Sequence, residues 1–141
     1  MKPSPAFVIL LALLSGCGQG GGDQERLKAM DGWRKAQAEG LPQDLDARWP
    51  RADAAKGAQL YAQHCLACHG AGGAGDGSAG AGLRPKPADL RAEIRQSTTA
   101  DIFSDISHGV SGSAMVAWQG SLSEEEIVQI IAHLHHLAGK P

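Results

Sequence analysis

Aromatic residues are scarce in this chain. Only 4% of its 141 residues are Phe, Tyr or Trp, and outside the N-terminal segment these are Tyr61, Phe103 and three tryptophans. A small domain has little apolar surface to bury and often needs additional stabilisation. The composition therefore argues against a large, self-sufficient core and favours a fold that encloses another apolar body.

A basic segment is also lacking. The formal net charge is -2, and lysines and arginines form no cluster along the sequence, which argues against a nucleic-acid partner. From residue 52 onward, acids outnumber cations, and we expect most of these charges to lie on a solvated surface. The cations are Lys56, Arg84, Lys86, Arg91, Arg95 and Lys140, and the acids are Asp53, Asp76, Asp89, Glu93, Asp101, Asp105, Glu124, Glu125 and Glu126.

Cysteine is rare, and none follows Cys68, so a second Cys-x-x-Cys pair for a four-ligand zinc site is missing. What is present is Cys65-Leu66-Ala67-Cys68-His69, the attachment pattern of c-type haem. Positions i and i+3 of a helical turn lie on one side, so both thiols can reach one porphyrin edge while His69 faces the iron. A zinc half-site and a redox dithiol are the alternatives. We predict one covalently attached haem c (iron) per chain, which also fills the core.

The N-terminal segment has the features of a secretory signal. Lys2 gives a positive start, and residues 6–14 form an apolar run that is too short to span a membrane. Leu14-Ser15-Gly16-Cys17 resembles the lipobox of bacterial lipoproteins, which are cleaved before a cysteine that carries lipid. We predict a signal peptide over 1–16, lipidation of Cys17, and a membrane-anchored protein that faces the periplasm of the bacterial cell envelope. An ordinary signal peptide is the alternative.

Residues 17–51 are predicted to be a lipidated linker followed by a short helical arm. Asp23 is expected to cap a helix that extends to about Glu39. The haem domain, a partner protein and the membrane surface are possible sites for this arm, and packing on the domain is our default expectation. Trp49-Pro50 is interpreted as the hinge into the domain proper, residues 52–141.

No stretch alternates polar and apolar residues with the period of a strand, so the predicted fold class is all-α. Asp53 is expected to start a helix that extends to about Cys65. The glycine-rich stretch over 70–82 cannot be a helix, and a shorter helix fits from about Thr99 to Ser107.

The last helix has the clearest signals. Ser123 and Glu126 have the spacing of a capping box, and Gly139 is suited to end the helix. Its apolar face is formed by Ile127, Ile130, Ile131, Leu134 and Leu137. The histidines near its C-terminal end are expected to be surface residues, where cations are favoured. These are His133, His135 and His136.

The second axial ligand decides what a haem protein can do. Coordination by Met and His raises the reduction potential of the haem iron and leaves no open coordination position on it, which suits electron transfer. We predict Met115 as this ligand, opposite His69, because it lies on a glycine-bounded loop far from His69 in sequence. His108 is the competing candidate, whereas Met30 is more simply a packing residue.

Several ordered motifs resemble the class I cytochrome c family, especially its bacterial periplasmic and cbb3-oxidase-like branch. The resemblance covers about residues 52–138. The motifs are Gly57 and Tyr61, Cys65 to Gly70, Gly75 to Gly77, Arg84 to Leu90, His108 to Gly112, Met115 to Trp118, and Leu122 to Ile127.

The resemblance implies a small cytochrome c fold in which the first and last helices cross near Gly57. It also implies that a carbonyl in the Pro85–Pro87 region accepts a hydrogen bond from Nδ1 of His69. Trp118 would cover a haem edge. One departure is Val116, because the family often has proline directly after the ligand methionine.

These observations predict an electron-transfer protein rather than an enzyme. It would be a membrane-anchored monohaem c-type cytochrome that carries single electrons between periplasmic or membrane redox partners. One alternative is a dedicated haem subunit of a dehydrogenase or oxidase complex. Another is a haem sensor or peroxidase-like protein in which Met115 is labile.

Overall fold

A computed structural model of the chain describes residues 41–140. The predicted signal peptide, the Cys17 lipid site and the helix expected after Asp23 lie outside these residues. The described helices are α2 (Leu45–Arg48), η1 (Trp49–Arg51), α3 (Ala54–His64), α4 (Leu66–His69), η2 (Ser78–Gly80), α5 (Leu90–Gln96), α6 (Thr99–His108) and α7 (Glu124–Leu137).

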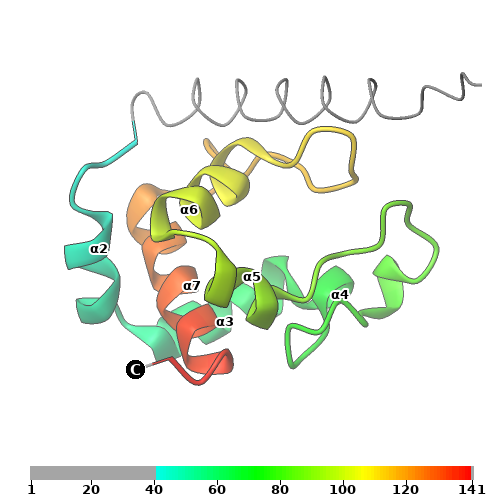
Figure 1. The fold of residues 1–141 in the computed structure, drawn as a ribbon, viewed down its shortest axis with the longest axis horizontal. Coiled ribbons are helices and arrows are strands. Elements are labelled where there is room, and N and C mark those ends of the chain that lie inside the picture. The colour runs from blue at the N-terminus through cyan, green and yellow to red at the C-terminus, as the bar shows by residue number, and fades with distance from the viewer. Residues whose placement is uncertain (1–40, 141) are drawn as a thin grey trace, which may run out of the picture. The chain divides into compact units, whose positions relative to one another are not determined.

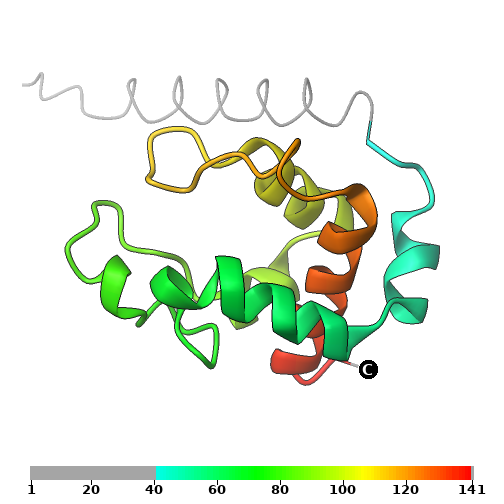
Figure 2. The ribbon, with the colours of Figure 1, turned by 180° about the vertical axis from the view of Figure 1, so that it is seen from behind.

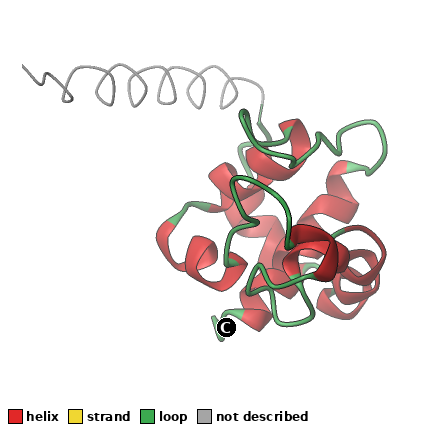
Figure 3. Cartoon of the chain, turned by 90° about the vertical axis from the view of Figure 1, so that its right-hand side faces the viewer, coloured by secondary structure: helices red, strands yellow, loops and turns green. Residues whose placement is uncertain are grey.

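Between residues 41 and 140 the chain forms no strand, apart from one isolated bridge that pairs Gln119 with Leu122 (Figure 3). The all-α prediction is therefore confirmed. None of the helices in this range has the length and apolar character that would be needed to cross a membrane.

Helix α3 begins where the sequence predicts. The Asp53 carboxylate caps it by accepting hydrogen bonds from the backbone N–H groups of Ala55 at 2.9 Å and Lys56 at 3.1 Å. Its buried residues Gly57, Leu60 and Tyr61 have the three- and four-residue spacing of one helical face. Helix α3 therefore has one buried face and directs its C-terminal end into the Cys65–His69 segment.

The capping box of α7 is also present. Ser123 Oγ accepts from the Glu126 N–H at 3.3 Å, and the Glu126 carboxylate accepts from the Ser123 N–H at 2.9 Å. These bonds from Ser123 hold the pKa of Glu126 below its ordinary value. Gly139, with φ of +66°, follows the end of the helix, and its N–H donates to the His136 carbonyl at 3.0 Å.

Helices α3 and α7 form the main helix–helix contact of the described domain (Figures 1 and 2). Gly57 makes this contact possible, because a Cβ atom there would overlap the carbonyl group of Gln129. The expected crossing of the first and last helices at Gly57 is therefore confirmed.

The shorter helices complete the core. Thr98 and Asp101 form a second capping box at the start of α6, which packs against α7. Helix α5 also contacts α7, and Lys140 Nζ donates to the carbonyl oxygen of Ile94 in α5 at 3.0 Å. The buried apolar cluster draws on all these elements and includes Leu60, Tyr61, Ile94, Ile102, Phe103, Ile106, Ile127, Ile130, Ile131 and Leu134.

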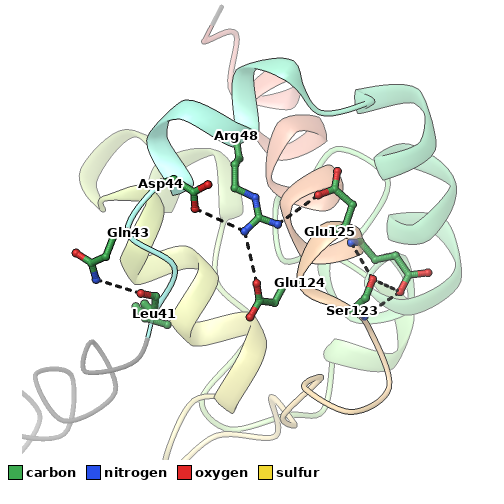
Figure 4. A network of polar contacts seen from close by, with 8 residues as sticks. Leu41, Gln43, Asp44, Arg48, Ser123, Glu124 and Glu125 are labelled. Carbon is green, nitrogen blue, oxygen red and sulfur yellow. Dashed lines mark hydrogen bonds and ion pairs between the residues drawn. The ribbon is translucent and has the colours of Figure 1, made fainter.

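The segment before the domain packs on it. Leu41 and Leu45 are buried, η1 contacts α7, and α2 contacts α6. The Arg48 guanidinium lies 3.5 Å from Glu124 and 3.3 Å from Glu125, at the start of α7 (Figure 4). Residues 41–51 are thus part of the compact fold, and Trp49-Pro50 lies within this packed segment as well as at the predicted hinge.

The expectation that the histidines near the end of α7 are surface residues is wrong for His135. His135 is not a surface residue, since only 6% of it is exposed. Its ring stacks on that of Trp49, with centroids 3.6 Å apart and planes 10° from parallel. The helical pattern of α7 alone could not reveal this, because the residue that covers His135 comes from the preceding segment. His133 is half-buried, and only His136 is exposed as expected.

Candidate functional site

The cysteine pair lies on a single helical turn. Cys65 ends α3 and starts α4, and its carbonyl accepts from the N–H groups of Cys68 at 3.2 Å and His69 at 2.9 Å. The two cysteines are partly exposed and are not joined in a disulfide. The turn therefore holds both thiols and the imidazole as one unit, as their spacing predicts.

Burial keeps the Cys65 thiol protonated at neutral pH. Burial, followed by the charge of Cys68, raises the pKa of Cys65 to about 11. Structural zinc sites bind deprotonated cysteines and usually have four ligands. Within residues 41–140, no three His, Cys, Asp or Glu side chains are grouped so that they could hold a metal ion.

His69 is oriented by the backbone of a distant segment. Its Nδ1 lies 3.2 Å from the carbonyl oxygen of Ala88. A carbonyl only accepts, so Nδ1 carries the proton and the lone pair remains on Nε2. Burial lowers the pKa of His69, and the bond to Ala88 partly opposes this shift, so burial favours the neutral ring, which is the form that binds a metal. The accepting residue is the one directly after the expected Pro85–Pro87 region.

A glycine-rich loop after His69 brings the segment that carries the Ala88 carbonyl close to His69. The Gly75 N–H donates to the His69 carbonyl at 2.9 Å, and the Leu90 N–H donates to the Gly73 carbonyl at 2.7 Å. Gly75 has φ of +75°, and a Cβ atom there would overlap the carbonyl oxygen of Pro87. The loop can therefore pass directly against the backbone that carries the Ala88 carbonyl.

Tyr61 secures the start of the same loop. Its buried hydroxyl donates to the Gly70 carbonyl at 2.7 Å. Burial first, then the charges of Cys65 and Asp76, raise the pKa of Tyr61 to about 12. The phenol therefore remains a hydrogen-bond donor throughout the neutral range.

Met115 lies on the loop between α6 and α7 and is partly buried. Its N–H donates to Ser113 Oγ at 3.1 Å, and its carbonyl accepts from the Val110 N–H at 3.1 Å. After it, the Trp118 N–H donates to the Ile106 carbonyl at 3.1 Å. These bonds hold the loop on both sides of Met115, although Val116 stands where proline is frequent.

Local contacts are made by His108, the competing candidate, and by His64, which directly precedes Cys65. Nδ1 of His108 lies 3.1 Å from the carbonyl oxygen of Ser104, one turn earlier in α6. The His64 ring meets the Trp118 ring edge-on, with centroids 5.0 Å apart. Each ring thus has a local contact of its own, and Met115 is the residue of the loop between α6 and α7 that offers a thioether sulfur.

Helix α4 and the loop between α6 and α7 lie at the same end of the domain, and α2 lies at the other (Figures 1 and 2). Apolar side chains are left exposed on both segments: Leu66 is 40% exposed, Val110 is 36% exposed and Val116 is 60% exposed. Two thiols, an imidazole with a free Nε2 and a thioether are the donor set that a c-type haem uses. The residues present therefore fit this group, and the exposed side chains suit its apolar porphyrin.

An all-α domain with a Cys-x-x-Cys-His turn and a backbone-oriented histidine defines a c-type cytochrome domain. The family model described as cytochrome C oxidase, cbb3-type, subunit III, matches residues 52–134, which is more than half of the chain. The chain belongs to this family. It is a cytochrome c domain and an electron carrier, and family membership implies covalent haem c.

Two curated relatives carry the name Cbb3-type cytochrome c oxidase subunit FixP. The protein from Bradyrhizobium diazoefficiens is 37% identical over 87 residues, which are 62% of this chain and 28% of the relative. The protein from a second Bradyrhizobium strain is 34% identical over 87 residues, with the same coverage of 62% and 28%. The chain thus matches less than a third of the length of these relatives.

Proposed function

We propose that this chain is a membrane-anchored monohaem cytochrome that carries single electrons between redox partners at the periplasmic face of a bacterial membrane. The observation that carries the proposal is the bond between His69 Nδ1 and the Ala88 carbonyl, because it leaves Nε2 free and aligned by the fold. In this proposal Cys65 and Cys68 form the two thioether links. A bound haem iron would supply the one-electron couple.

His69 and Met115 are the two axial ligands in this proposal. Support for Met115 comes from its place on a loop that lies at the α4 end of the domain and is tied by backbone hydrogen bonds. His108 is the competing candidate, and its Nδ1 lies 3.1 Å from the Ser104 carbonyl within α6, which leaves Nε2 open as in His69. The choice of Met115 therefore rests on its place on the loop and on the Met and His pair that suits electron transfer. A thioether opposite an imidazole leaves no position for substrate, which fits an electron carrier.

The proposed organisation has three parts. Residues 1–16 are the signal peptide, residues 17–51 are the lipidated linker and arm, and residues 52–141 are the cytochrome c domain. The lipobox-like sequence before Cys17 supports lipid attachment there. One lipid-modified cysteine and two haem-bound cysteines would account for all three thiols of the chain.

A role as a dedicated subunit of an oxidase or dehydrogenase complex is the second candidate. Its support is that both relatives are named as oxidase subunits and match this chain at 34–37% identity. The chain would then exchange electrons within one complex rather than diffuse between partners. Solubilisation in mild detergent distinguishes the two functions, because a subunit purifies with a partner in fixed ratio and a carrier purifies alone.

Intact-mass analysis combined with a redox titration tests the proposal. We expect one haem to remain attached after denaturation, and a single one-electron transition in the titration. The Cys65→Ala and Cys68→Ala double variant should lose the covalently bound mass. A wild-type mass equal to that of the haem-free chain would contradict the proposal.

A further inference from the structure

The carbonyl that orients His69 belongs to the peptide unit that begins α5. This unit is planar, so the direction of the Ala88 carbonyl is coupled to the backbone of Asp89, which follows it. Asp89 is the N-cap of α5 and has φ of -73°. Its own carbonyl accepts from the N–H groups of Ala92 at 3.0 Å and Glu93 at 3.1 Å. Any movement of this helix start would therefore turn the carbonyl that faces His69.

The Asp89 side chain fixes this helix start. Oδ1 accepts from the Arg91 backbone N–H at 3.0 Å and from Arg91 Nε at 3.0 Å, and Oδ2 accepts from Arg91 Nη2 at 2.8 Å. Bonds to Arg91 hold the pKa of Asp89 near 2, so the carboxylate is an acceptor at all neutral pH values. The side chains of Arg91 and Asp89 are 40% and 39% exposed, so their ion pair contributes little by charge alone.

The same helix start is tied to the loop after His69. The Leu90 N–H donates to the Gly73 carbonyl at 2.7 Å, and the Gly75 N–H donates to the carbonyl of His69 itself at 2.9 Å. The His69 ring is thus bonded to the carbonyl of Ala88, and the loop after His69 is bonded to the N–H of Leu90. Asp89 lies between these two residues in sequence and caps α5.

We propose that Asp89 is a positioning residue for His69, which it serves by capping α5 and so holding the Ala88 carbonyl against Nδ1. The inference rests on the proposed function, since it concerns His69 as an axial ligand. A strong bond at Nδ1 raises the basicity of Nε2, and a more basic ligand stabilises the oxidised state. Loss of the Asp89 carboxylate therefore weakens this bond and raises the reduction potential.

The test compares haem-loaded variants by two measurements: the hydrogen-exchange rate of His69 Nδ1–H in the reduced protein by NMR, and the reduction potential. In Asp89→Ala we expect exchange of the His69 Nδ1–H to be roughly tenfold faster, a factor that corresponds to the net contribution of one hydrogen bond. We also expect a higher reduction potential. Asp89→Ser retains a capping oxygen, so both values should return toward those of the wild type. Asp89→Gly removes the carboxylate with less loss of helix stability, and provides the same test if Asp89→Ala does not fold.

Asp53→Ala is the matched control. Asp53 caps α3 as Asp89 caps α5, but it is not adjacent to the Ala88 carbonyl. We expect this variant to lose stability without a change in Nδ1–H exchange or in potential. Wild-type exchange in Asp89→Ala and Asp89→Gly would overturn the inference while leaving the proposed function intact. Equal changes in Asp53→Ala would overturn it too, because the effect would then be one of general stability. A wild-type protein without covalent haem would instead overturn the proposed function, and this inference with it.

Discussion

The Trp49 ring stacks on the ring of His135, with centroids 3.6 Å apart, and joins the segment before the domain to its last helix. His135 is buried, Trp49 is partly buried, and Nδ1 of His135 has no hydrogen-bond partner among the described residues. Burial first, then the charge of Lys140, lower the pKa of His135, while Asp46 opposes the shift. The folded protein therefore disfavours the protonated ring.

This contact predicts a pH-dependent stability. Below the ordinary histidine pKa of 6.5, the unfolded chain binds a proton at His135 more readily than the folded protein does. The free energy of unfolding should therefore decrease as the pH falls from 6.5 toward the lowered pKa. His135→Phe retains an aromatic ring but cannot titrate, so the decrease should be smaller. Denaturant unfolding of the haem-loaded protein at several pH values measures this.

His136→Gln is the control for the loss of one histidine, because His136 is exposed on the same helix. It should retain most of the wild-type decrease, because the charge of His136 is only the second cause, after burial, of the lowered pKa of His133. Part of the decrease should also persist in His135→Phe, since burial lowers the pKa of His133 as well. An identical pH dependence in His135→Phe and the wild type would show that the stacked ring does not contribute.

The helix crossing at Gly57 predicts a strong effect of a single methyl group. In Gly57→Ala, the new Cβ atom would overlap the Gln129 carbonyl, which belongs to the backbone of α7 and cannot rotate away. We expect the free energy of unfolding to fall by about 2–3 kcal/mol, as is usual for overpacking. Gly72→Ala is the matched control, because a Cβ there has no neighbour within 4 Å. Its stability should be unchanged or rise by less than about 1 kcal/mol. Equal stability of the two variants would contradict the tight crossing.

The proposed lipid site predicts a change of cell fraction. Cys17→Ser removes the sulfur that would carry lipid and leaves the haem motif unchanged. We expect the wild-type protein in the membrane fraction and the variant outside it, with the same haem absorbance in both. A Ser15→Ala variant retains Cys17 and should remain with the membranes. Retention of the Cys17→Ser protein in the membrane fraction would contradict lipid anchoring.

The elements that the sequence predicted well have local signals. Asp53, Thr99 and Ser123 mark the beginnings of three helices within one residue, because capping depends on neighbours along the chain. Helix α5 was missed, although Asp89 is a capping residue directly before it. Its seven residues follow two prolines and show too short an apolar pattern to be distinguished from an extended segment.

Long-range relationships were harder to predict. The burial of His135 depends on Trp49, which is far away in sequence and was interpreted as part of a hinge. The resemblance narrowed the partner of His69 Nδ1 to Pro85–Pro87, but the accepting carbonyl belongs to Ala88. Main-chain acceptors are the same in every residue type, so only the path of the glycine-rich loop decides which one faces the ring.

In the proposed function, His69 and Met115 are the axial ligands of a closed electron carrier. The absorption spectrum of the oxidised protein tests it most directly, before and after Met115→Ala, with Met30→Ala as a methionine control. We expect a weak red-edge sulfur-to-iron band in the wild type and in Met30→Ala, and its loss in Met115→Ala. Absence of the band from the wild type, or its persistence in Met115→Ala, would rule out Met115 as the ligand.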